Sequence, residues 1–342
     1  MQKPSVASSW FTVNVRMGEM QTHEEISIFP LFITCIEGPV YVSLKAGIQK
    51  GLIITEIGQE GSVPLLKAQN PTDSHVLLLD GEELSGAKQN RVLNTTLLIQ
   101  AGASIEIPVS CTEQGRWRWD SRRFEDSNVL MAPAMRRRKN ESVFENLKRR
   151  GRHDSNQMQV WDDIAHYSRM HHAFSETRAM KSMFEEKRFD WKPYTEAFPC
   201  QEGQCGLIAL IRGNVVSLEL VSRPDVYRDI HEKMILSLVM DIPFWKPHHL
   251  RGVQDVETFL KHLQEATEEA FPAVGVGTDL RYKGQHLIGS ALVVDNWVIH
   301  LALYHQSNHR SSFHPDHGRN RYPSYDDFGP VRGRSFRRMP QP

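Results

Sequence analysis

Cysteine is scarce in this chain, and a long apolar run is missing altogether. The four cysteines among 342 residues, Cys35, Cys111, Cys200 and Cys205, are too few and too scattered for a disulfide framework. Cys200 and Cys205 are not followed by a second Cys or His pair at the spacing of a zinc site. No stretch approaches the length that spans a bilayer, and the N-terminus has no basic segment followed by an apolar core. We therefore expect a cytosolic protein with reduced thiols and no metal site.

An excess of either charge is also missing. The 41 Lys and Arg residues are balanced by 41 Asp and Glu residues, which removes any general electrostatic reason to expect nucleic acid or a membrane surface as the partner. The sequence contains no nucleophile motif and no phosphate loop, so it names neither a reaction nor a cofactor. What it does contain is 40% hydrophobic residues, enough to build a folded core.

The first region, residues 1–130, is predicted to be a β-rich unit, a sandwich or a roll. Short apolar runs alternate there with glycine-containing turns, as expected for strands; these runs are residues 40–44, 52–57, 63–68, 76–79 and 92–99. Ile105, Ile107 and Val109 alternate with Glu106, Pro108 and Ser110, which indicates a further strand. Its proline favours an edge strand or a strand end.

The second region, residues 131–200, is predicted to be a basic connector followed by helices. Eight Lys or Arg residues face two acidic ones between Met131 and Arg152. From Met158 to Phe189 the residues favour one or two helices, with a proposed inner stripe of Trp161, Ile164, Ala165, Ser168 and His172.

The third region, residues 201–305, predicts an antiparallel sheet with two helices, so the fold class is α+β. Strands are expected at residues 206–211 and 215–221, followed by a helix that Pro224 opens and that carries Tyr227, Ile230, Met234 and Leu238 on one stripe. A second helix should start near Asp255 and end at Pro272. A strand at 277–282 and a hairpin of 286–294 and 297–304, joined by Asp295 and Asn296, complete the unit. One strand face of the hairpin, Trp297, Ile299, Leu301 and Leu303, should point into the core.

The last region, residues 306–342, is predicted to be a disordered tail. It has no apolar run, and its Gly, Pro, Ser, Arg and His residues cannot bury enough surface to offset the entropy cost of ordering.

Charged residues collect between the strands of the first region, from Asp80 to Trp119, and this favours a ligand site there. Arg91 could bind a phosphate or carboxylate in a fork, with a glutamate as base or as a partner for ribose hydroxyls. The candidate ligand-binding residues in this segment are Glu82, Glu83, Lys88, Asn90 and Arg91. If the pocket is empty, Lys88 and Arg91 should lie within reach of Glu82 or Glu113, since unoccupied cations are normally balanced by carboxylates. The alternative is a solvated hairpin loop that Asp80 and Gly81 nucleate.

Glu113, Arg116 and Trp117 extend the candidate site. Arg116 and Trp117 could offer a cation and a stacking face to an adenine or nicotinamide ring. The alternative is a Trp packed on the rim, with Arg116 paired to Glu113. Cys111 is expected to be a buried, inert thiol, because no histidine lies close in sequence to activate it.

Two later residues are second-tier candidates. Arg281, near a strand end, could bind an anion. His300 lies on a strand face, and its default interpretation is a core histidine whose hydrogen bonds are satisfied.

Three strings in the sequence resemble the ARG and rhodanese-phosphatase superfamily-associated protein domain, a bacterial family named for its gene neighbours. They are residues 78–84 with 86–91, residues 107–117, and residues 275–281 with His300. The resemblance covers roughly residues 26–304. Because the neighbours are ADP-ribosylglycohydrolase-like and phosphatase-like proteins, it implies proximity to ADP-ribose or NAD-derived nucleotide metabolism. It assigns no reaction and no catalytic residue.

We therefore expect the protein to bind, and by extension to process, an ADP-ribose-like or other phosphorylated nucleotide metabolite. The alternative is a non-catalytic interaction module that contacts a protein or nucleic acid through its basic connector and its tail. Convergence of the candidate side chains in one pocket would favour the first; charges that point outward would favour the second.

Overall fold

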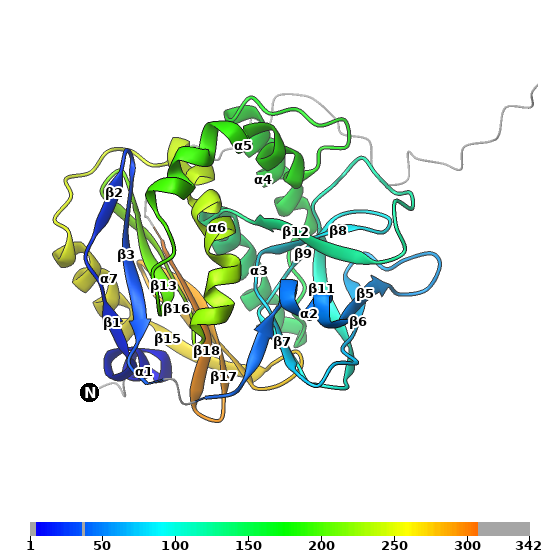
Figure 1. Cartoon of the computed structure of the whole chain (residues 1–342), viewed down its shortest axis with the longest axis horizontal. Helices are drawn as coiled ribbons and strands as arrows, with labels where there is room; N and C mark the ends of the chain where they lie inside the picture. Colours follow the sequence, from blue (N-terminus) through cyan, green and yellow to red (C-terminus); the bar gives the residue numbers. More distant parts are fainter. Residues whose placement is uncertain (1–4, 36–37, 307–342) are drawn as a thin grey trace, which may run out of the picture. The chain divides into compact units, whose positions relative to one another are not determined.

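An antiparallel sheet of nine strands is the largest element of the protein in the computed structural model, which describes residues 5–35 and 38–306 (Figure 1). The strands run in the order β1-β3-β13-β14-β18-β17-β16-β15, and β2 pairs with β3 outside this path. Their bounds are β1 Val15–Met17, β2 Gln21–His23, β3 Ile26–Ile33, β13 Gln204–Ile211, β14 Asn214–Val221, β15 Thr267–Pro272, β16 Thr278–Lys283, β17 Leu287–Val294 and β18 Trp297–His305.

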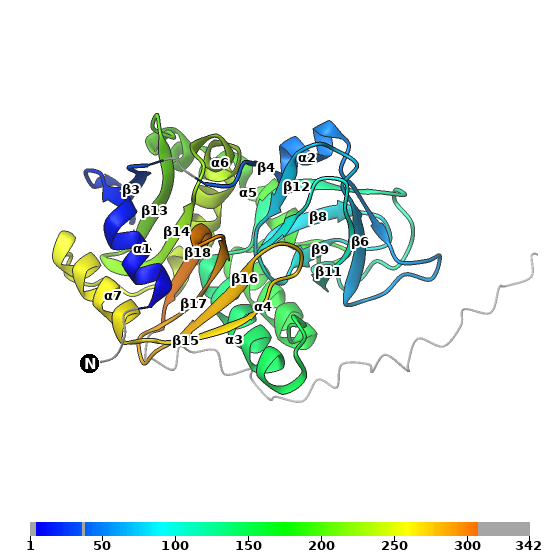
Figure 2. The same ribbon diagram turned by 90° about the horizontal axis from the view of Figure 1, so that it is seen from below.

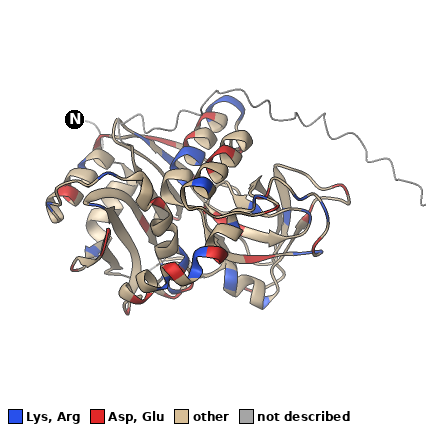
Figure 3. Cartoon of the chain, turned by 90° about the horizontal axis from the view of Figure 1, so that it is seen from above, with Lys and Arg blue, Asp and Glu red and all other residues tan. Residues whose placement is uncertain are grey.

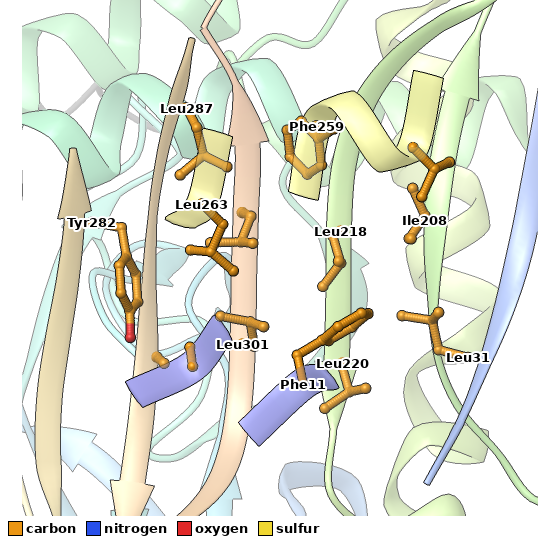
Figure 4. Packing of buried hydrophobic residues seen from close by; sticks show 14 of the residues in the cluster. Phe11, Leu31, Ile208, Leu218, Leu220, Phe259, Leu263, Tyr282, Leu287 and Leu301 are labelled. Carbon is orange, nitrogen blue, oxygen red and sulfur yellow. The ribbon is translucent and has the colours of Figure 1, made fainter. Parts of the chain in front are cut away.

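The two faces of this sheet differ in chemistry because successive side chains of a strand point to opposite sides. Leu218 and Leu220 of β14 join an apolar core with the helices α1 (Val6–Asn14) and α7 (Val253–Glu265). Figure 4 shows Phe11 of α1, and Phe259 and Leu263 of α7, on the same side of the sheet as these leucines. Their neighbour Glu219 points to the other face, where α3 (Pro133–Arg150) lies. The helix α6 (Pro224–Asp241) packs beside α3 and against β13 and β14.

The second β part has its own core and consists of two smaller sheets. A six-stranded sheet runs β12-β8-β9-β11-β6-β5 and a three-stranded sheet runs β10-β7-β4 (Figure 2). The strand bounds are β4 Tyr41–Ser43, β5 Ile53–Glu56, β6 Leu65–Gln69, β7 His75–Leu78, β8 Glu82–Gly86, β9 Arg91–Leu93, β10 Leu97–Ile99, β11 Ser104–Cys111 and β12 Phe124–Leu130. Aliphatic side chains such as Leu66, Leu78 and Ile107 fill the space between these sheets.

The remaining helices are short or lie over the sheets. They are α2 (Leu44–Lys50), α4 (Gln157–Met170), α5 (Met180–Ala197) and a 3₁₀ turn, η1 (Ile242–Phe244). Figure 3 shows basic and acidic segments interleaved along the helices.

The predicted α+β class is confirmed, and so are several elements. Asp295 and Asn296 have φ angles of 50° and 64°, so they form the predicted tight hairpin turn between β17 and β18. Pro224 opens α6, and the expected stripe from Tyr227 to Leu238 is buried.

Other predictions differ from the structure at particular elements. The run 92–99 forms two strands, β9 and β10, which belong to different sheets. Residues 267–272 form β15 and are not helical, because α7 ends at Glu265 and Thr267 to Pro272 pair with β16. In α4 the buried side chains are Val160, Asp163, Ile164 and Tyr167, so of the proposed stripe only Ile164 faces inward. β18 is buried on both faces, since helices cover both sides of its sheet.

The boundary predicted at residue 130 does not separate the sheets. β3 pairs with β13 along most of its length, from Ile26 with Ile211 to Phe32 with Gln204, so the first 35 residues complete the sheet of the third region. The predicted basic connector is the helix α3, whose Arg136 and Lys139 are fully buried. The predicted disordered tail lies outside the described residues, apart from Gln306.

Candidate functional site

The segment from Asp80 to Trp119 forms β8, β9, β10 and β11, the connections between them, and the loop that follows β11. Most of the candidate residues are buried there: the charged Glu82, Glu83, Lys88, Arg91 and Glu113 and the neutral Asn90 are all less than 9% exposed. This arrangement is neither a solvated hairpin loop nor a row of outward charges. Each buried charge instead has protein partners, and these partners divide the candidates into separate groups.

Arg91 is held by groups from two other strands, β5 and β11, and from the β8–β9 turn. Its guanidinium donates to Gln89 Oε1 at 2.7 Å, contacts the sulfur of Cys111, and lies 3.4 Å from Glu56 Oε1. The prediction placed Arg91 within reach of Glu82 or Glu113; its ion-pair partner among the described residues is Glu56 of β5, which the prediction did not name. Burial raises the pKa of the Cys111 thiol to about 11, which fits the expected inert cysteine.

Lys88 lies at the edge of the same group, beside two exposed indoles. Its ammonium donates to the carbonyl of Glu60 at 2.6 Å. It also lies 5.4 Å from the ring centre of Trp117 and 5.3 Å from that of Trp119. The indoles are 44% and 49% exposed, while Arg91 lies 5.4 Å from Trp117. We call Lys88, Trp117 and Trp119 the Trp-Lys surface.

Arg116 and Glu113 form the ion pair that the alternative interpretation predicted. Arg116 lies 2.7 Å from Glu113 Oε2, and it also donates to Asn90 Oδ1 and to the carbonyls of Gly86 and Ala87. Burial acts to raise the pKa of Glu113, but hydrogen bonds from Arg116, Thr177 and the Asn90 amide, together with the charge of Arg116, outweigh it, so this pKa is lowered. Arg116 therefore ties the loop after β11 to the β8–β9 turn.

The two glutamates of β8 have separate environments. Glu82 accepts from the Leu79 amide and lies 2.5 Å from Lys233 of α6, so its charge is balanced from another helix. Glu83 accepts from the Thr112 hydroxyl at 2.6 Å, and burial raises its pKa to about 7. Neither carboxyl group reaches the Trp-Lys surface through a contact in the structure.

His300 and Arg281 belong to a buried polar layer between the nine-stranded sheet and α3. His300 contacts the Thr96 hydroxyl through Nδ1 at 2.9 Å, and its Nε2 lies 3.5 Å from Glu219. Arg136 pairs with the same Glu219, and Lys139 pairs with Asp80. Arg281 donates to Thr95 and Asp279, and His153 contacts Asp279 from the surface side. These charges join the two β parts through the loop between β9 and β10.

Sequence reasoning did not find Glu56, Lys233 or Glu219 as partners, because each lies 35 or more residues from the group it balances. Trp119 was also missed as a candidate, although its spacing of two from Trp117 was a usable signal. In an extended segment, residues two apart point to the same side.

Two further findings bound the chemistry. Within residues 5–35 and 38–306, no group of three or more His, Cys, Asp or Glu side chains is placed to hold a metal ion. In the same part of the chain, no helix combines the length and the apolar character needed to cross a membrane.

The fold and the site together define an α+β protein in which a nine-stranded sheet and two smaller sheets share a buried ionic layer. Two exposed indoles in the loop after β11 lie beside the largely buried Lys88. Among known families, the chain belongs to that of the ARG and Rhodanese-Phosphatase-superfamily-associated Protein domain, whose family model matches residues 14–304. The resemblance read from the sequence is thereby confirmed. No curated protein and no solved structure matches the chain.

Proposed function

We propose that this protein binds a phosphorylated nucleotide metabolite of the ADP-ribose type at the Trp-Lys surface. The observation that carries the proposal is the pair of half-exposed indoles, Trp117 and Trp119, whose ring centres lie 5.4 Å and 5.3 Å from the ammonium group of Lys88. Large exposed aromatic side chains next to a cation are unusual on a surface that serves only for solubility.

Each part of such a ligand has a matching group. An adenine or nicotinamide ring stacks on an indole, a contact worth about 1–3 kcal/mol per base when the aromatic residue is replaced by alanine. Lys88 has used one ammonium hydrogen on the Glu60 carbonyl, which leaves two for phosphate oxygens. Arg91 adds positive charge from behind Trp117 but is held by Glu56 and Gln89.

The proposal is limited to binding. Glu82 and Glu83 are buried and carry protein partners, so no carboxylate is assigned the role of base. We further propose the cytosol as the location, because all four cysteines are free thiols, two of them buried. The alternative, an interaction module, loses support at α3, where Arg136 and Lys139 are spent on internal ion pairs.

The proposal is tested by thermal shift and calorimetry with ADP-ribose, NAD, adenosine and pyrophosphate. A ligand that binds the native state at 100 times its Kd stabilises it by about 2.7 kcal/mol. We expect ADP-ribose or NAD to raise the midpoint, and adenosine and pyrophosphate, each with half of the recognised chemistry, to act more weakly.

Variants separate binding from folding. Trp119→Ala and Lys88→Ala should remove the ligand effect with little change in the ligand-free midpoint, whereas Lys67→Ala, at an exposed lysine of β6, should leave it intact. Arg91→Ala should instead lower the ligand-free stability by roughly 3–5 kcal/mol, because it leaves Glu56 buried and uncompensated. If no nucleotide shifts the wild-type midpoint, or if Trp119→Ala binds as well as wild type, the proposal is wrong.

A further inference from the structure

The outer face of α5 carries an apolar side chain that nothing in the described chain covers. Phe189 is 86% exposed, and Phe174, in the loop before α5, is 83% exposed. The Phe174 amide donates to Glu186 of α5 at 3.0 Å, so this loop lies against the turn of the helix that precedes Phe189. Met170, at the end of α4, adds a third exposed apolar side chain. Two phenylalanines so exposed in neighbouring segments mark a contact surface.

The opposite face of α5 already has its partners. Met183, Phe184, Trp191 and Tyr194 are buried, and they pack the helix onto the protein. The exposed face therefore does not contribute to the core.

Charged residues flank Phe189 on both sides along α5. Their charges, read outward from Phe189 in one direction, are opposite in sign to the charges read outward in the other direction. Along one stripe of α5 lie Lys181, Glu185, Phe189, Lys192 and Glu196. At 100° per residue, all five fall within an arc of about 80°. Read from either end, the stripe gives opposite charges at matching positions on the two sides of Phe189.

In two antiparallel copies of this stripe, related by a twofold axis at Phe189, residues of opposite charge face each other. Their axial distances from Phe189 differ by about 1.5 Å, the rise of one helical residue. Glu185 lies about 6 Å before Phe189 along the axis and Lys192 about 4.5 Å after it, so each faces the other in the second copy. Lys181 and Glu196, at about 12 Å and 10.5 Å, match in the same way. Pro193 lies about 40° off the stripe and leaves the Phe189 carbonyl without its helical donor, hence free to accept at the surface.

We propose that the protein forms a twofold homodimer in which α5 packs antiparallel against α5 of a second copy. A twofold interface must be self-complementary. The charges of this stripe meet that requirement. The two phenylalanines meet at the axis, and Phe174 from each copy widens the apolar contact. Within each helix, Lys181 with Glu185 at 3.3 Å and Lys192 with Glu196 at 3.1 Å already hold the side chains in position. Such a contact is small, so it dissociates at about micromolar concentration.

The first experiment measures sedimentation of the full chain at concentrations from about 1 to about 100 µM, a range that brackets the expected Kd. We expect a concentration-dependent monomer–dimer equilibrium. Phe189→Asp should make the protein monomeric, because two carboxylates would meet at the axis. Val13→Asp, at a residue of α1 that is 76% exposed, is the matched control and should dimerise like wild type.

The second experiment uses the charges. Glu185→Lys and Lys192→Glu should each weaken dimerisation roughly tenfold or more, since each places like charges opposite one another twice. An equimolar mixture of the two variants should recover it, because every facing pair is then opposite in charge. Circular dichroism confirms that all variants are folded.

Three results would overturn the proposal. They are a wild-type chain that stays monomeric throughout the range, a Phe189→Asp variant that still dimerises, and a mixture that remains monomeric. Binding of a wild-type monomer to lipid vesicles would assign the exposed phenylalanines to a membrane surface instead.

Discussion

At the scale of single residues, the protein depends on charges that are buried and paired rather than exposed. Arg91, Arg136 and Arg281 have no exposed surface, and each lies beside a carboxylate: Glu56, Glu219 and Asp279. A buried pair adds little net stability compared with apolar groups, but the loss of one member is costly because the other stays buried and charged. Most of the residues that the sequence suggested as ligand-binding residues instead form contacts between segments of the chain.

Glu83 gives the clearest dependence on pH. Its pKa is raised by burial from 4.5 to about 7, so the folded state favours the protonated form. The stability that this proton contributes is complete below about pH 4.5 and is lost as the pH rises through 7, on the order of 3 kcal/mol in total. We expect Glu83→Gln, which stays neutral, to lose less stability than wild type between pH 4 and pH 8 in urea titrations.

The comparison between wild type and Glu83→Gln isolates the contribution of Glu83 to the pH dependence of stability. Asp163 and Asp241, whose pKa values burial raises to about 7 and about 6, titrate in both and cancel. Parallel stability curves for wild type and Glu83→Gln would contradict the assignment.

At the scale of elements, β18 depends on burial from both sides. Every residue from Val298 to Tyr304 is at most 1% exposed, because α1 and α7 cover one face of its sheet and α3 covers the other. The carbonyl of Ile299 accepts from the Ser222 amide at 2.9 Å and from the Tyr41 hydroxyl at 3.2 Å. This strand therefore joins the sheet to β4 of the smaller sheets.

A charge at Ile299 should consequently prevent folding. Ile299→Asp buries an unpaired carboxylate, so we expect no soluble, cooperatively folding protein in circular dichroism and thermal melts. Asn296→Asp, three residues away in the exposed turn, adds the same charge and should fold normally. Ile299→Val should fold with a loss of about 0.5–1.5 kcal/mol. A native-like Ile299→Asp protein would disprove the strand assignment.

The sequence predicted elements better than their partners. The Asp295–Asn296 turn and the α6 stripe were predicted because turn chemistry and helical spacing are local signals. The division of residues 92–99 into two strands was not predicted. Asn94 to Thr96 connect β9 to β10, which belongs to another sheet, and no local signal shows that the chain changes sheets there. α3 looked like a solvated connector because its acidic partners, Asp80 and Glu219, lie 59 and 83 residues away. For the same reason the sequence did not predict that Glu56 and Lys233 balance the charges of Arg91 and Glu82.

At the scale of the whole molecule, the chain cannot be divided where its composition changes. β3 has no partner among residues 39–200, and it is the neighbour of β13 on the path of the large sheet. Arg136 of α3 balances Glu219 of that sheet, so residues 201–305 also need the segment before them.

Fragments test this interdependence. We expect residues 1–130 and residues 201–306, each expressed alone, to be aggregated or unfolded by size exclusion and circular dichroism, since each exposes unpaired strand edges. Residues 1–200 co-expressed with 201–306 should reassemble, because the break at residue 200 falls between α5 and β13 and cuts no strand. Cooperative unfolding of the isolated 201–306 fragment would show that it is an independent domain.

The pairing of β3 with β13 also constrains the order of events during synthesis. Residues 26–33, which read ISIFPLFI, leave the ribosome long before their partners at residues 204–211. At about 5–20 residues per second, the apolar strand waits roughly 10–40 s for its neighbour. A nascent chain must keep this segment from pairing elsewhere during that interval. We therefore expect chaperones to capture the N-terminal strand β3 in the cell. We also expect the yield to fall when translation is slowed between residues 35 and 204, because β3 pairs with a strand that is made much later.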